Sequence, residues 1–134
     1  MRLLNDDVDL RTLSPLTLAF IGDAVYDLMV REQLVCEGNR PVGKLNDDKI
    51  KLVRCESQSQ AAARLLPLMT DEEQAVFKRG KNAHAPTVPK HSDKTTYHTA
   101  TGLEALFGYL YLKGETARLK ELFDYMGSDD NDGA

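Results

Sequence analysis

Residues 14–32, with the sequence SPLTLAFIGDAVYDLMVRE, constrain the fold more than any other part of the chain. Ser14 can cap a helix N-terminus, and Pro15 suits the first helical position. Apolar residues then recur at spacings of three and four, which predicts an amphipathic helix that must bury one side against other elements. The apolar stripe consists of Leu18, Ile21, Val25, Leu28 and Met29.

Gly22 and Asp23 interrupt this apolar run. A glycine inside a helix costs roughly 1 kcal/mol relative to alanine, so it usually marks the close approach of another backbone or a ligand. A carboxylate at the next position is unfavourable unless it meets a cation, a hydrogen-bond donor or water. On spacing alone, the simplest interpretation of Asp23 is a solvated residue paired with Asp27 and Arg31, and a functional role is the alternative.

The rest of the chain shows helical periodicity and no strand pattern. Caps, glycines and prolines divide it into expected helices over about residues 15–37, 45–55, 56–67, 71–81, 95–113 and 116–126. We therefore predict an all-α domain of about six or seven helices. The domain should span residues 1–127, and the acidic segment 128–134 is expected to be a disordered tail.

Composition limits the classes of protein that remain. The chain has 134 residues, of which 42% are hydrophobic, and these values fit one domain with a real core. No apolar run approaches the roughly 20 residues of a membrane span, and the acidic N-terminus does not suit a signal peptide. Cys36 and Cys55 fit no metal or disulfide spacing, so we expect a cytoplasmic protein without a membrane partner.

One segment, residues 78–97, stands out as basic in a chain whose net charge is −4. Its cations are Lys78, Arg79, Lys81, Lys90 and Lys94. Either this is a solvated loop or it contacts a phosphate backbone, where its cations would release condensed counterions. Gly80 and Asn82 would let the backbone come close to a phosphate.

Three histidines, His84, His91 and His98, are evenly spaced in or beside this segment. The spacing suggests a metal site, but Pro86 and Pro89 break the helical alignment and no cysteine accompanies the histidines. Phosphate or ribose contacts, or simple solvent exposure, are therefore the better interpretations.

A second carboxylate of interest, Glu104, lies in the expected helix over residues 95–113. It sits off that helix's apolar stripe and one turn before Gly108, so an exposed helix glutamate is one interpretation. The other follows if this helix and the first one cross near their glycines. Asp23 and Glu104 then converge, and converging carboxylate oxygens suit Mg²⁺.

Two stretches resemble the ribonuclease III family. IGDAVYDLMVRE is similar to its LGDAVLELVVSE-type segment, and TGLEALFGYLYLKG is similar to its DxFEALIGAIYLD run. With the KRGKNA and TVPK motifs between them, the match from about Leu16 to Leu122 resembles the short relatives called Mini-ribonuclease III. The resemblance implies that Asp23 and Glu104 are catalytic metal ligands for Mg²⁺, with Mn²⁺ able to substitute.

The same resemblance implies a homodimer that cleaves double-stranded RNA during maturation of the precursor of large-subunit (23S) ribosomal RNA. The catalytic domain is then expected to bind RNA without an appended double-stranded-RNA-binding domain, or with the help of a ribosomal protein. We assign RNA binding to seven residues of the basic segment: Lys78, Arg79, Lys81, Asn82, Lys90, His91 and Lys94.

The chain departs from full-length ribonuclease III at two acidic positions, which are Ala19 and Thr101 here. Two rival functions stay open. The missing acidic groups favour a non-catalytic helical RNA-binding or ribosome-assembly factor, and metal-dependent hydrolysis of small phosphate esters would need a closed pocket. The sequence assigns no role to Tyr97 or Thr101.

Overall fold

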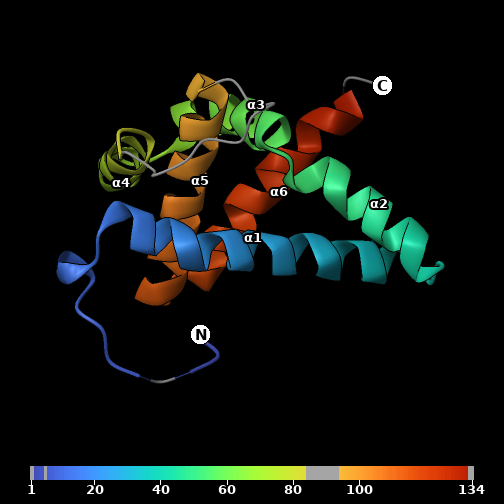
Figure 1. Ribbon diagram of the computed structural model, residues 1–134, viewed down its shortest axis with the longest axis horizontal. Coiled ribbons are helices and arrows are strands. Elements are labelled where there is room, and N and C mark those ends of the chain that lie inside the picture. The colour runs from blue at the N-terminus through green and yellow to red at the C-terminus, as the bar shows by residue number, and fades with distance from the viewer. Residues whose placement is uncertain (1, 5, 84–93, 133–134) are drawn as a thin grey trace.

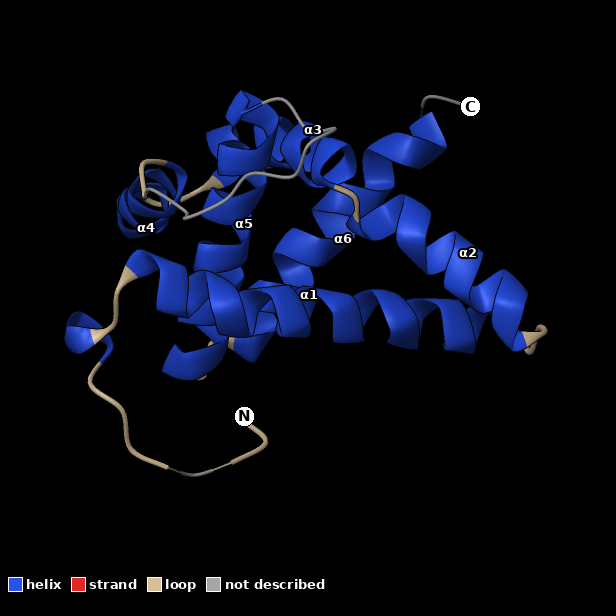
Figure 2. Ribbon diagram, in the orientation of Figure 1, coloured by secondary structure: helices blue, strands red, loops and turns tan. Residues whose placement is uncertain are grey.

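The computed structural model describes residues 2–4, 6–83 and 94–132. Within these residues the chain forms six α-helices and no strand (Figure 1 and Figure 2), which confirms the predicted all-α fold. The helices are α1 (Pro15–Glu37), α2 (Val42–Val53), α3 (Cys55–Leu65), α4 (Asp71–Lys81), α5 (Lys94–Lys113) and α6 (Thr116–Asp132), with short 3₁₀ turns at Leu10–Thr12 and Leu66–Leu68.

The centre of the fold is the crossing of α1 and α5 (Figure 1). Glycines from both helices lie at this contact. A Cβ atom added to Gly22 would lie 1.6 Å from the carbonyl oxygen of Glu104, and one added to Gly108 would lie 2.0 Å from that of Leu18. Because any larger residue would collide with backbone, glycine allows the two helices to touch. The expected crossing at the glycines is confirmed.

The buried face of α1 differs in part from the predicted stripe. Its main row repeats every four residues along the helix and consists of Leu18, Gly22, Tyr26, Val30 and Leu34, and Ala19 is buried beside this row. Leu28 was expected to be buried, but its side chain is 55% exposed. The physical reason is that the contact is centred on Gly22, and a row at four-residue spacing from that glycine excludes Leu28.

The hydrophobic core surrounds α5, which packs against α1, α3, α4 and α6. Leu103, Leu106 and Phe107 are fully buried there, as the apolar periodicity of this helix predicts. None of the helices in the part of the chain that the structure describes is both long and apolar enough to cross a membrane.

Side-chain caps fix the starts of two helices that build the site. The hydroxyl of Ser14 accepts a hydrogen bond from the Thr17 amide at 3.1 Å, which starts α1 as predicted. Thr70 and Glu73 form a capping box at the start of α4. The buried Glu73 carboxylate also accepts a hydrogen bond from Arg118 of α6 at 2.8 Å. These contacts hold α4 in a fixed position beside α5.

Two helix boundaries differ from expectation. α2 begins at Val42, earlier than the predicted start near residue 45, because Pro41 can precede a helix directly. α6 continues through Gly127 to Asp132, since a single glycine weakens a helix by only about 1 kcal/mol. The helix therefore enters the segment expected to be a disordered tail. The division into a domain over 1–127 and a tail over 128–134 stays a prediction.

Candidate active site

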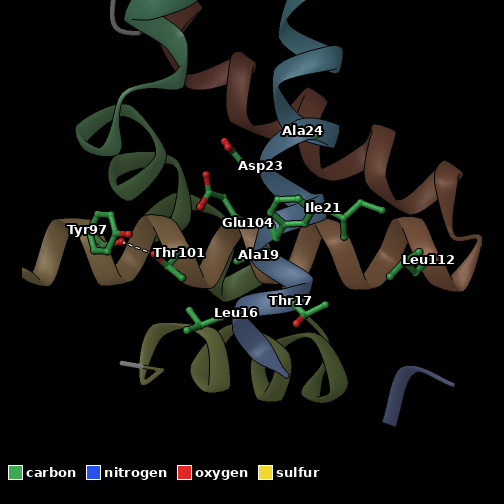
Figure 3. A pocket seen from close by; sticks show the side chains of 11 residues that line it. Leu16, Thr17, Ala19, Ile21, Asp23, Ala24, Tyr97, Thr101, Glu104 and Leu112 are labelled. Atoms are coloured by element: carbon green, nitrogen blue, oxygen red, sulfur yellow. Dashed lines mark hydrogen bonds between the residues drawn. The ribbon is translucent and has the colours of Figure 1, made fainter. Parts of the chain in front are cut away.

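The crossing of α1 and α5 brings Asp23 and Glu104 together. Both line an open cleft of about 750 Å³, and Figure 3 shows the two carboxyl groups beside each other on its wall. Asp23 is exposed to solvent and Glu104 is half-buried. Residues 81 positions apart in the sequence therefore share one acidic site that water can reach.

Asp23 is exposed to solvent, as the simplest interpretation expected, but the ion pair with Arg31 is made by Asp27 instead. The Asp27 carboxylate accepts a hydrogen bond from Arg31 Nε at 2.6 Å and lies 3.6 Å from Lys49 Nζ. Asp27 therefore belongs to an ordinary surface ion pair one turn further along α1. The alternative in which Asp23 pairs with this arginine is wrong.

The surroundings of Glu104 raise the pKa of its carboxyl group to about 8. Burial is the largest cause, because it disfavours the charged form. The hydrogen bond with Asp23 and the negative charge of that carboxylate raise the pKa further, whereas a hydrogen bond with Gln58 lowers it. At neutral pH and without metal, Glu104 thus retains a proton. A divalent cation would displace this proton, so we expect metal binding to strengthen as the pH rises.

Replacing Glu104 by glutamine should stabilise the metal-free protein. Between the ordinary pKa of 4.5 and the raised value of about 8, the folded state binds more protons than the unfolded state. Stability therefore falls as the pH rises through this range. Because glutamine resembles the protonated form, we expect Glu104→Gln to unfold at a higher temperature. The gain should grow from pH 5 to roughly 2 kcal/mol at pH 8, with solvent screening by the open cleft included.

Thermal unfolding in a chelator at several pH values measures this effect. Glu56→Gln, which changes an exposed glutamate on α3, is the matched control and should change stability by less than about 0.5 kcal/mol. If Glu104→Gln changed the stability by the same amount at pH 5 and pH 8, Glu104 would not carry a proton at neutral pH.

Two further positions near the carboxylates carry no acid. Ala19 and Thr101 are buried and line the same cleft. The Thr101 hydroxyl donates a hydrogen bond to the carbonyl oxygen of Tyr97 at 3.0 Å, one turn earlier on α5 (Figure 3). Among the described residues, no group of three or more histidines, cysteines, aspartates or glutamates could hold a metal. Asp23 and Glu104 are the candidate ligands for a metal ion in this cleft.

Five of the seven predicted RNA-binding residues lie at the adjoining ends of α4 and α5. Lys78, Arg79 and Lys81 form the last turn of α4, Asn82 caps it, and Lys94 begins α5. The intervening Gly80 packs closely on the α5 turn that contains Thr101 and Gly102. Gly80, within the basic end of α4, therefore lies against the turn of α5 that precedes Glu104.

The remaining predicted residues of the basic segment, Lys90 and His91, lie outside the described residues, as does His84. His98 lies on α5, and its ring is edge-on to that of Tyr97 with the centroids 5.9 Å apart. The proposed contacts of the two residues outside the described ranges stay predictions.

The sequence pattern did not mark Gln58 of α3, which lowers the pKa of the Glu104 carboxyl group. Its side chain is only 2% exposed. One signal was available, because Gln58 occupies the same helix face as Ala61, Ala62 and Leu65. A polar residue in an otherwise apolar row needs a buried partner.

An all-α domain with two carboxylates at a helix crossing is a candidate divalent-metal-binding protein. Comparison with known proteins identifies its family. Residues 16–115 match the family described as Ribonuclease III domain. Proteins named Mini-ribonuclease 3 from Thermoanaerobacter sp. (strain X514) and Symbiobacterium thermophilum are 44% and 43% identical, and the alignments cover 84% and 83% of this chain and 80% and 85% of theirs. The crystal structure of a Fusobacterium nucleatum protein is similar with a TM-score of 0.80 at 30% identity, covering 88% of this chain and 96% of that one. The chain belongs to the ribonuclease III family and, within it, to the Mini-ribonuclease III proteins.

Proposed function

We propose that this chain is a divalent-metal-dependent endonuclease that cleaves double-stranded RNA. The observation that carries the proposal is the pairing of Asp23 and Glu104 at the Gly22–Gly108 crossing, open to a cleft. Ribonuclease activity follows from the family, whose members generally depend on divalent metal. Beyond ribonuclease activity, we propose that the enzyme is specific for double-stranded RNA and uses Mg²⁺.

The residues present fit Mg²⁺ better than a softer metal. The site offers carboxylate oxygens, and Mg²⁺ prefers oxygen ligands while keeping several waters or borrowing phosphate oxygens from a substrate. Asp23 and Glu104 would hold the ion, with Mn²⁺ able to substitute. When bound, the metal supplies an activated water and neutralises charge on the leaving oxygen. The protein itself anchors the ion, releases the Glu104 proton and presents the site to a long substrate.

The basic end of α4 is the surface that we propose contacts the RNA backbone. Lys78 and Arg79 are exposed, and no ion pair within the described residues neutralises them. Lysine and arginine contacts to phosphate are independent of sequence, and A-form RNA is recognised mainly by shape. We therefore expect the protein to bind duplex RNA with weak sequence preference. The other residues assigned to RNA binding would contact the phosphate backbone of the same RNA.

Neutralising Lys78, Arg79 and Lys81 together as glutamines should weaken duplex binding and flatten its salt dependence. Each phosphate contact that is lost reduces the slope of log K against log salt by about one. Filter binding or fluorescence anisotropy over a range of salt concentrations measures this slope. The control changes three exposed lysines on α2 and α6 to glutamine: Lys44, Lys51 and Lys120. If the two triple variants showed equal slopes, the RNA would not contact the basic end of α4.

A two-fold symmetric dimer is the proposed assembly. Phe20 is 82% exposed on α1 beside the acidic cleft, and Leu28 is exposed two turns further along. Ala24 lies between them and lines both this cleft and a neighbouring apolar one. Such an exposed apolar row on one helix suits a self-complementary interface. A dimer would supply one acidic site for each RNA strand. We expect sedimentation to show a dimer, and a monomer at micromolar concentration would require another explanation of double-strand cleavage.

The proposed natural substrate is the precursor of 23S ribosomal RNA, processed in the cytoplasm, with a ribosomal protein as an additional partner. This step rests on the resemblance to Mini-ribonuclease III. The duplex stems of that precursor offer the polyanionic A-form surface that the basic end of α4 would contact.

A non-catalytic RNA-binding or ribosome-assembly factor is the second candidate function. Ala19 and Thr101 motivate it, because both occupy cleft positions where full-length ribonuclease III carries acids. The resemblance to the short relatives implies similar losses there, so these residues support the subfamily rather than inactivity. Hydrolysis of small phosphate esters fits less well, since the cleft is open and such a substrate would need a closed pocket.

Incubation of wild-type protein with a long RNA duplex distinguishes these functions. We expect both strands to be cut with Mg²⁺ and neither with a chelator, and single-stranded RNA of the same sequence to be cut far less. An intact duplex in the presence of Mg²⁺, with RNA binding retained, would favour the non-catalytic factor.

A further inference from the structure

One face of α5 carries a row of polar side chains that runs from the first turn of the helix to the acidic pair. The row consists of Lys94, Tyr97, Thr101 and Glu104, at spacings of three, four and three residues. Side chains at these spacings lie on the same side of a helix. The last three line the open cleft, and Figure 3 shows them one after another along α5. Tyr97 therefore lies on the cleft wall between Glu104 and the start of the helix.

The phenol hydroxyl of Tyr97 is available to a molecule in the cleft. The residue is half-buried, and its carbonyl oxygen accepts the hydrogen bond from the Thr101 hydroxyl, so its backbone is held in place. Among the residues that the structure describes, the phenol hydroxyl itself has no hydrogen-bond partner. A tyrosine has an apolar ring and a polar tip, which suits a position where the ring packs on protein and the hydroxyl faces a ligand.

We propose that Tyr97 is a specificity-determining residue, whose hydroxyl binds a ribose 2′-hydroxyl of the strand that is cut. The inference rests on the proposed function of the Asp23–Glu104 pair. The seven residues from Tyr97 to Glu104 span about 10 Å of helix. A strand of a duplex rises roughly 3 Å per nucleotide. With the bond to be cut at the carboxylates and the strand along α5, a ribose about three nucleotides away reaches Tyr97.

A phenol suits a ribose hydroxyl better than it suits a phosphate. Lys94 is exposed one turn earlier on the same face and supplies a charged donor, and charged donors bind phosphate about twice as strongly as neutral ones. A phenol both donates and accepts a hydrogen bond, as does a 2′-hydroxyl. The 2′-hydroxyl is also the group by which a protein distinguishes RNA from DNA. Tyr97 would thus add a preference for RNA that cationic contacts to phosphate do not supply.

The test combines Tyr97→Phe with RNA that lacks single 2′-hydroxyls. Phenylalanine keeps the ring and removes the hydroxyl. Tyr125→Phe changes an exposed tyrosine on α6 that does not line the cleft, and it serves as the matched control. The substrates are a short RNA duplex with one mapped cut and a series of duplexes that each carry one 2′-deoxynucleotide in the cut strand, at positions up to about five nucleotides from the cut.

With saturating Mg²⁺, we expect Tyr97→Phe to lower kcat/KM on the all-RNA duplex by about 3–10-fold, the effect of one lost hydrogen bond. The control should match the wild type. At one deoxynucleotide position the wild type should lose the same factor, and Tyr97→Phe should lose nothing further there. Such a non-additive pair shows that the two hydroxyls contact each other.

An equal loss by Tyr97→Phe on every substrate would overturn the ribose contact, since neither a structural defect nor a phosphate contact depends on a particular 2′-hydroxyl. Unchanged cleavage of the all-RNA duplex by Tyr97→Phe would also overturn it. The wild-type protein gives a test that does not depend on folding of the variant, because the proposal is wrong if no single deoxynucleotide slows its cleavage. In each of these outcomes wild-type cleavage leaves the proposed function standing. Failure of the wild type to cut the all-RNA duplex with Mg²⁺ would remove both.

Discussion

Asp23→Asn is expected to abolish cleavage of a long RNA duplex, with a loss of at least about 10³-fold, and to leave duplex binding within a few-fold of wild type. Asparagine keeps the shape of aspartate and can still hydrogen bond to Glu104, but it removes the exposed charge that anchors the metal. Metal assistance supplies several kcal/mol of transition-state stabilisation, and each 1.36 kcal/mol is a factor of ten in rate. Single-turnover cleavage and a binding assay in a chelator measure the two quantities separately.

Asp27→Asn is the matched control for this change. It makes the same substitution one turn further along α1, where the carboxylate pairs with Arg31 and Lys49. Surface ion pairs of this kind contribute at most about 1 kcal/mol, so cleavage should persist. If Asp23→Asn retained wild-type cleavage, or if both variants lost it equally, the assignment of Asp23 as metal ligand would be wrong.

Gly22→Ala should destabilise the fold severely. Its Cβ would lie 1.6 Å from the carbonyl oxygen of Glu104 and 2.7 Å from the amide nitrogen of Gly108. Both neighbours are backbone atoms, so α1 and α5 must separate along their contact. We expect a loss of about 3–5 kcal/mol in the free energy of unfolding, measured by urea denaturation. Cleavage should also fall, because the same separation moves Asp23 away from Glu104.

Gly43→Ala on α2 provides the comparison. A Cβ added at Gly43 meets no atom within 4 Å, so alanine there should raise stability by up to about 1 kcal/mol through its helix propensity. A Gly22→Ala protein as stable as wild type would mean that the helices do not touch at this glycine.

The sequence predicted the part of the fold that depends on local chemistry. Ser14 marks a helix start that the structure confirms, since a cap acts on residues three positions away. The glycine at position 22 also predicted the helix crossing, because no local benefit explains a glycine there. From that crossing, the convergence of Asp23 and Glu104 followed.

The remaining features depend on contacts between distant segments, which spacing does not reveal. Leu28 matched an apolar stripe yet is exposed, because the contact with α5 selects which row of α1 is buried. Gln58 is buried because α3 packs against α5, and the spacing of residues along α3 does not show that contact. The raised pKa of Glu104 likewise depends on burial and on the neighbouring carboxylate, and both arise only when the helices pack.

Anomalous scattering from crystals grown with Mn²⁺ would show whether the two carboxylates hold one metal ion between them. We expect a strong peak within ligand distance of carboxylate oxygens from both Asp23 and Glu104, and no such peak in crystals of Asp23→Asn grown under the same conditions. A peak that is absent from the wild type, or that contacts only one of the two residues, would contradict a metal centre at the crossing of α1 and α5.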